Sequence, residues 1–272
     1  MKANGFLNII ILMVLFLSQT VLSASVCTDP TKGPLCFNMK YLRSQVMAIG
    51  AQRELMQINY PYLESIGHEI DDTATNIRQN GLLGSLHDAG IVEIQSKAQS
   101  LIVEAKEQDP MALATSNVIQ KKCAACHSSA SPVSGIDWDQ IFKSDWENIA
   151  KNCAREGRTP YLCRSMNGML SAYSGILASS ELGRKNFTAL KYSALEIARI
   201  SSDLQVKKVF HVTDPLGIVQ TKAEEVVRLA SEQNPEAYEK GLQITQSCMQ
   251  CHGTYALSKP MGMNISTFKV IK

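Results

Sequence analysis

The chain has little excess charge of either sign, no long apolar run and few aromatic side chains. Its 272 residues carry 27 lysines and arginines against 25 aspartates and glutamates, a net charge of +2. This balance gives neither the basic field that nucleic-acid binding needs nor an acidic tail. The most apolar run, residues 9–17, is nine residues long, whereas a membrane-spanning helix needs about 20. We therefore expect no nucleic-acid partner and no membrane span in the mature protein.

Strand patterns are missing as well. No segment alternates apolar and polar residues between turn signals. A helical pattern is present instead, with apolar side chains at a three-four spacing that buries one face of a helix. It runs through Ile91, Ile94, Ala98, Leu101 and Ala105 and is repeated by Val219, Ala223, Val226 and Ala230. We expect an all-α fold.

The first 25 residues have the pattern of an export signal. Lys2 supplies a positive end, residues 9–17 supply the apolar centre, and small residues follow at 23–25. We predict that residues 1–25 are a signal peptide and that the mature protein is soluble and periplasmic.

The remainder of the chain is an internal duplication. An offset of 127 residues aligns Cys36 with Cys163 and Glu69-Ile70 with Glu196-Ile197. An offset of 125 aligns Cys123-Ala-Ala-Cys126-His127 with Cys248-Met-Gln-Cys251-His252. The two-residue difference falls between about 71 and 97, and such a change is tolerated in a loop. We predict one domain at 26–134, a linker helix at 135–152 and a second domain at 153–272.

Each copy should contain four helices. We expect breaks near Pro61, at 81–90 and at Asp109 in the first copy, and near Asn186, at 207–217 and at Asn234 in the second. Asp109-Pro110 and Asn234-Pro235 each have an N-cap residue before a proline at the first helical position. Short connections favour an up-down-up-down four-helix bundle in each copy. The start of its first helix, its second loop and the end of its last helix then share one end of the bundle.

The two C-x-x-C-H sequences are c-type haem attachment motifs. Their thiols (Cys123, Cys126, Cys248 and Cys251) add to the vinyl groups of two haem c molecules, and the adjacent His127 and His252 become iron ligands. A redox-active C-x-x-C of the thioredoxin type would need strands, and a zinc site would need more ligands. Two motifs at matched positions in an exported chain favour haem.

Four cysteines remain, in two pairs that occupy matching places. Cys27 precedes Cys36 by nine residues, and Cys153 precedes Cys163 by ten. In an oxidising compartment such thiols pair. We predict one disulfide in each copy, between Cys27 and Cys36 and between Cys153 and Cys163, and each closed loop should stabilise the fold by about 2 to 3 kcal/mol.

Each copy carries its haem motif near the end of its last helix. The first helix of the first copy contains Tyr41-Leu-Arg43-Ser-Gln-Val-Met47. Together these features resemble the cytochrome c prime family of four-helix-bundle cytochromes. The resemblance implies that Met47, four residues after Arg43, is the sixth ligand of the first haem iron. The matching residues of the second copy are Leu170 and Ser174. The basic residue that the family carries four positions after the haem histidine is replaced by Ser131 and Ala256.

The sixth ligand of the second haem stays open. Met166 and Met169 are alternatives to Ser174, although they lie on other faces of a helix with 100° per residue. His87 and His211, which we expect in the loop at the haem end of each copy, are either distal ligands, pH-sensitive neighbours or exposed loop residues.

Two haems without an acid-base constellation favour electron transfer between redox partner proteins, and not an enzyme, as the function. A different possibility is the binding or sensing of NO or CO at a five-coordinate second haem. A dihaem peroxidase-like enzyme is a third, but the chain shows no recognisable distal His or Arg/Glu pair.

Overall fold

The computed structural model of the protein describes residues 33–55, 57–83, 85–129, 160–182, 185–207 and 214–256. These residues are all-helical and include no strand. Their helices are α2 (Gly33–Glu54), α3 (Tyr60–Gln79), α4 (Ser85–Lys106), α5 (Met111–Ser129), α8 (Pro160–Glu181), α9 (Phe187–Val206), α10 (Asp214–Ser231) and α11 (Glu236–Ala256). The predicted signal peptide and linker helix lie outside the described residues.

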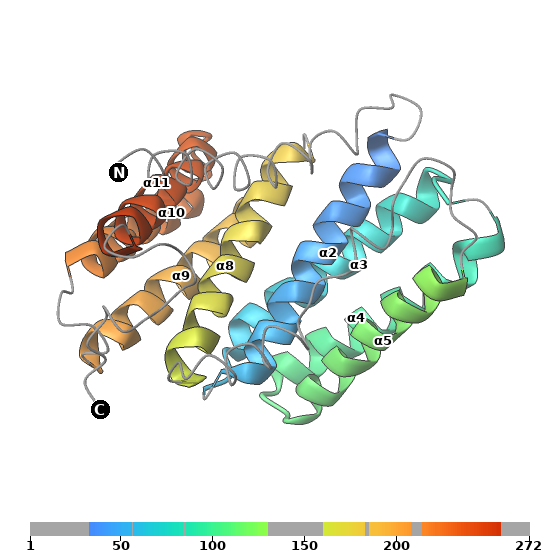
Figure 1. Cartoon of the computed structure of the whole chain (residues 1–272). Coiled ribbons are helices and arrows are strands. Elements are labelled where there is room, and N and C mark those ends of the chain that lie inside the picture. Colours follow the sequence, from blue (N-terminus) through green and yellow to red (C-terminus); the bar gives the residue numbers. More distant parts are fainter. Residues whose placement is uncertain are drawn as a thin grey trace, which may run out of the picture.

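The helices form two sets in chain order (Figure 1). In the first set, α3 packs against α2 and α4, α4 packs against α5, and α2 contacts α5 more loosely. In the second set α9 packs against α8 and α10, α10 packs against α11, and α11 contacts α8. The sets meet along α2 and α8, with a smaller contact between α3 and α9. None of the described helices is long and apolar enough to cross a membrane.

The breaks between helices agree with the sequence prediction at Asp109, Asn186 and Asn234. Before two of them, Gln108 and Gln233 have positive φ angles of 56° and 54°. The amides of Asp109 and Asn234 then donate to carbonyls five residues back, which closes the preceding helix. The Asp109 and Asn234 side chains accept hydrogen bonds from Met111 N at 2.8 Å and Glu236 N at 3.0 Å. Helices α5 and α11 therefore begin one residue later than predicted.

Two predicted breaks differ from the structure. The first lies at residues 55–59, because Asn59 caps α3 through a 3.2 Å hydrogen bond from Tyr62 N, and Pro61 belongs to the first turn of that helix. The second of these breaks, predicted at 81–90, ends where α4 begins at Ser85. Asp88 lies in the first turn of α4, where a negative charge is favourable. His87 is consequently a helical residue and not a loop residue, which corrects our prediction. His211 lies outside the described residues.

One apolar core runs through both sets. The predicted stripes of α4 and α10 are buried, and they belong to the same cluster as Ile49 and Ile70 of the first set and Ile176 and Ile197 of the second. The core continues across the contact between α2 and α8, so the two sets pack as one body.

Buried polar side chains connect the sets reciprocally. The side-chain amide of Asn59, at the start of α3, donates to Glu196 Oε2 on α9 at 2.7 Å. The matching Asn186, at the start of α9, donates to Glu69 Oε1 on α3 at 2.5 Å. Such an exchange of equivalent contacts is typical of a two-fold interface, and here both halves belong to one chain.

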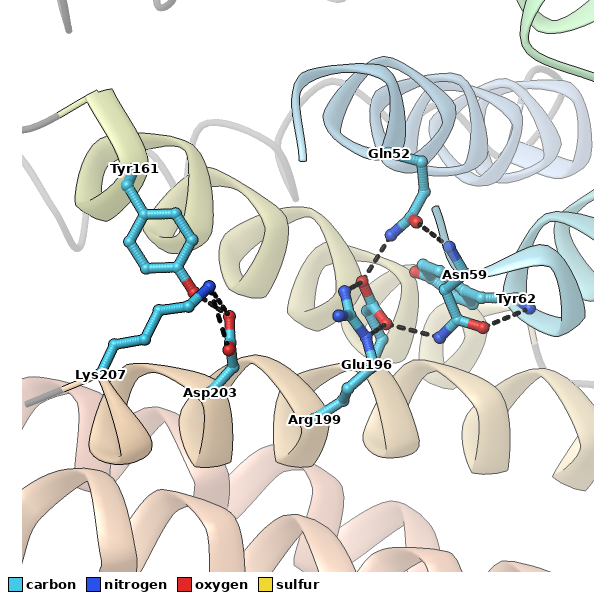
Figure 2. A network of polar contacts seen from close by, with 8 residues as sticks. All are labelled: Gln52, Asn59, Tyr62, Tyr161, Glu196, Arg199, Asp203 and Lys207. Atoms are coloured by element: carbon cyan, nitrogen blue, oxygen red, sulfur yellow. Dashed lines mark hydrogen bonds and ion pairs between the residues drawn. The ribbon is translucent and has the colours of Figure 1, made fainter. Parts of the chain in front are cut away.

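Glu196 is the centre of one of these networks (Figure 2). Its carboxylate is fully buried and accepts hydrogen bonds from Gln52 Nε2 at 2.5 Å and from Arg199 at 2.7 and 2.8 Å, besides the bond from Asn59. The first set supplies Gln52 and Asn59, and the second set supplies Arg199. A buried carboxylate needs this degree of compensation, so the network fixes α9 against α2 and α3.

Candidate functional site

Both C-x-x-C-H motifs lie in the last turns of the last helix of their set. Cys123 of α5 is 5% exposed, and Cys126 is half-buried. Burial raises the pKa of the Cys123 thiol to about 12, with a smaller contribution from Cys126. Cys123, Cys126 and Cys248 are thiols and not disulfides. The side chains of His127, Cys251 and His252 lie outside the described part of the structure.

The start of α4 lies against the first motif. A Cβ atom at Gly90 would be 3.6 Å from Cys126 Sγ. This is an ordinary van der Waals distance, so a side chain at residue 90 would lie directly beside the Cys126 thiol.

Helix α2 runs past the same motif in the opposite direction (Figure 1). Arg53 indicates the register between α2 and α5. Its two terminal nitrogens donate to Asn117 Oδ1 and Gln120 Oε1 of α5, each at 2.7 Å. Met47 precedes Arg53 by six residues. Because both helices rise about 1.5 Å per residue, Met47 lies level with residues 123–126 to within about one turn. Met47 is half-buried on the helix that contacts α5, and its role as an iron ligand stays a prediction.

Arg43 lies one turn before Met47. Its Nε atom is buried and has no hydrogen-bond partner among the described residues. Burial also lowers the pKa of the guanidinium, which nevertheless stays protonated. Buried donors are nearly always satisfied, so this atom fits an anionic group of a ligand at the same end of the first set. A haem propionate is such a group.

The second set differs at the matching positions. The Ser174 hydroxyl donates to the Leu170 carbonyl of its own helix at 2.9 Å. Leu170, which replaces Arg43, is 54% exposed. An exposed leucine beside the α11 motif fits contact with a large apolar group, but it offers no charge and no ligand.

Both alternative methionines of the second set pack against residues of α9. Ser201 of α9 donates a hydrogen bond to the Met169 sulfur at 3.3 Å. Met166 packs against the small apolar cluster of Leu162, Ile200, Leu204 and Leu216. Met169 also packs against the main core, which includes Ala237 and Ile244 of α11.

Tyr173 is a residue of the second site that the sequence analysis did not identify. Its hydroxyl donates to the Leu242 carbonyl of α11 at 3.4 Å. Burial, and secondarily the charge of Cys248, raise the pKa of Tyr173 to about 12. The matching residue of the first copy is Val46, so comparing the two copies position by position would have revealed the difference.

A polar cluster is also specific to the second set, where α8 begins and α9 ends (Figure 2). The Tyr161 hydroxyl donates to Asp203, which also pairs with Lys207 Nζ at 3.2 Å. That ammonium lies 4.1 Å from the centre of the Tyr161 ring. The aligned residues of the first copy are Pro34, Asn76 and Asn80.

The disulfide prediction is tested only in part. Cys36 and Cys163 are both disulfide-bonded. Their predicted partners, Cys27 and Cys153, lie outside the described residues, so the pairing stays a prediction.

No protein-family model, curated protein or solved structure matches this chain.

Proposed function

We propose that the protein is a periplasmic dihaem c-type cytochrome that carries electrons between redox partner proteins. In this proposal α2–α5 and α8–α11 are two tandem four-helix bundles of the cytochrome c prime type, each holding one haem c. The observation that carries the proposal is the repeated C-x-x-C-H at the end of α5 and α11, next to the first helix of the same set.

The residues of the first set fit such a group. Cys123 and Cys126 would hold the porphyrin, His127 would bind the iron from α5, and Met47 would bind it from α2. The buried Nε of Arg43 would pair with a propionate. When bound, haem supplies the one-electron chemistry, whereas the chain sets its potential through the axial ligands, burial and nearby charge.

The second set supports a further role. Cys248, Cys251 and His252 would hold the second haem. The Ser174 hydroxyl is a poor iron ligand, because it is short and donates a hydrogen bond to the Leu170 carbonyl. Since Met166 and Met169 contact α9, we infer an open sixth position there. NO or CO would bind at that position, and gas binding or sensing is therefore our second candidate function.

A ferrous absorption spectrum recorded with and without carbon monoxide tests both candidates. The proposal predicts a c-type spectrum with two haems per chain and binding of about one carbon monoxide per two haems. A protein that shows no haem spectrum would contradict the cytochrome assignment. Two haems that bind no carbon monoxide would contradict the gas-binding role alone.

A further inference from the structure

Helices α2 and α8 occupy equivalent positions in their own sets. Each is the first helix of its set and contacts the motif helix on one side, α2 contacting α5 and α8 contacting α11. On another side α2 and α8 contact each other. The α2–α8 pair therefore lies between α5 and α11, the two helices that carry the motifs (Figure 1).

The contacts between α2 and α8 fix their register. A Cβ atom at Gly175 would lie 3.7 Å from Gln45 Nε2, and one at Gly168 would lie 3.6 Å from both methyl groups of Leu55. Residue numbers increase along α2 as they decrease along α8, so the helices are antiparallel. Met47 follows Gln45 by two residues, so on the antiparallel α8 it lies opposite the residue two positions before Gly175, which is residue 173. The contact of Gly168 with Leu55 places residue 176 opposite Met47 instead, so Met47 and Ser174 lie at the same height to within about one helical turn.

The contact between α2 and α8 is close and buried. A Cβ atom at Gly175 would be 3.2 Å from Ser193 Oγ of α9 and 3.7 Å from Gln45 Nε2 of α2, so a large side chain at residue 175 would displace its neighbours. Packed helices of this kind have axes about 8–10 Å apart. The side chains of Gln45, Ala48, Ser171 and Ala172 are buried, so protein atoms and not bulk solvent fill the space between the two first helices.

We propose that the α2–α8 pair is an electron path between the two haems, with the first haem as the acceptor. This inference rests on the proposed function. One electron leaves the ferrous second haem, which becomes ferric, and reduces the ferric first haem. No covalent bond to the chain forms or breaks, and a reduced partner protein supplies the next electron to the second haem.

The direction follows from the residues on the two helices. A methionine ligand opposite histidine raises the reduction potential of a haem, and Met47 is available only in the first set. The positive charge of Arg43 also favours the ferrous state, because reduction lowers the positive charge of the iron. Leu170 and Ser174 contribute neither effect in the second set.

Flash photolysis of the full-length protein tests the path. The protein is reduced by one electron per two haems under carbon monoxide, which holds that electron on the second haem. A flash removes the carbon monoxide, and we expect the absorbance of the first haem to shift to ferrous and then revert as carbon monoxide rebinds. The rate should not change with protein concentration. No transfer to the first haem, or a rate proportional to concentration, would overturn the path.

Two single-residue variants locate the path. Gly175→Leu inserts a side chain between α8 and its neighbours Gln45 and Ser193, and we expect it to slow the transfer severalfold. Gly67→Ala is the control, because its Cβ would meet Ile102 Cγ1 of α4 at 2.7 Å and so strains helix packing away from α8. We expect the control to transfer at the wild-type rate. Equal slowing in both variants would overturn the assignment to α2 and α8.

Other outcomes separate this inference from the proposed function. Without haem, the proposed function fails. With two haems that bind no carbon monoxide, reduction by a flash-generated flavin semiquinone replaces photolysis, and a concentration-independent shift of the electron to the first haem is again the expected result. With two haems and no such shift, only the electron path fails.

Discussion

At the scale of single residues, the two copies differ most where their first helices pass the motif helices. Met47 and Ser174 occupy the same position, yet a thioether binds haem iron and a hydroxyl bonded to its own helix binds it poorly. The copies share the cysteines of their C-x-x-C-H motifs, so under the proposed function this one position would give the two haems different chemistry.

Met47→Leu and Met39→Leu test this difference as a matched pair. Both changes remove a thioether from α2 and keep the side-chain volume nearly constant, but Met39 is buried in the core. We expect carbon monoxide binding by the ferrous protein to rise from about one toward two per chain in Met47→Leu only. If Met47→Leu keeps the wild-type spectrum and stoichiometry, Met47 is a core residue and not a ligand.

Tyr62 gives a prediction for alkaline pH. Burial, and secondarily the charge of Glu196, raise its pKa above the usual range, although a hydrogen bond with Ser193 opposes the shift. Its contribution to stability is complete below pH 10 or so, where the unfolded phenol starts to ionise, and is lost as the pH rises further. We expect the unfolding free energy of Tyr62→Phe to decline less steeply above that pH, by up to about 1.4 kcal/mol per pH unit. Equal slopes in urea titrations of both proteins would contradict this assignment.

At the scale of helices, Asn59 has two functions. Its Oδ1 atom caps α3, and its Nδ2 atom donates to Glu196 of the other set. Asn59→Ser should keep the cap and lose the second bond, which costs about 1.5–3 kcal/mol for a bond to a charged group. Asn59→Ala should lose both and cost about 1 kcal/mol more. Urea unfolding measures the two differences.

Asn234→Ser is the control for this series. Asn234 caps α11 through Glu236 N, and no bond from its side chain to the other set is observed. We expect this variant to be as stable as the wild type. If Asn59→Ser is equally stable, the bond to Glu196 does not contribute to the contact between the sets.

The helices could be predicted from the sequence because their signals are local. The apolar stripe of α4, the cap at Asn186 and the turn at Asp109 each depend on residues within a few positions. His87 was misplaced because the break was predicted to extend from Gly81 to Gly90, whereas α4 begins within that range, at Ser85.

The contact between the sets could not be predicted in this way. The repeat revealed that Glu69 and Glu196 are equivalent, but their partners Asn186 and Asn59 are more than one hundred residues away. The orientation of Met166 and Met169 toward α9 likewise depends on tertiary packing. The role of Met47 as an iron ligand rests on the resemblance to a family and stays a prediction.

At the scale of the whole molecule, the duplication has produced an interface of the kind found in symmetric dimers. Reciprocal bonds from Asn59 and Asn186 and a shared apolar core hold the two sets together. An interface that is large and apolar opposes relative motion of domains. The arrangement would keep the two haem sites at a constant separation, which suits electron transfer within one chain.

The central claim is that each half of the chain carries one covalently bound haem. The most direct test is the mass of the protein after purification from the periplasm and denaturing extraction with acid and organic solvent. We predict a mass with two haems attached, and with one haem attached after the double substitution Cys248→Ala and Cys251→Ala. A wild-type polypeptide that carries no haem after extraction would contradict the account.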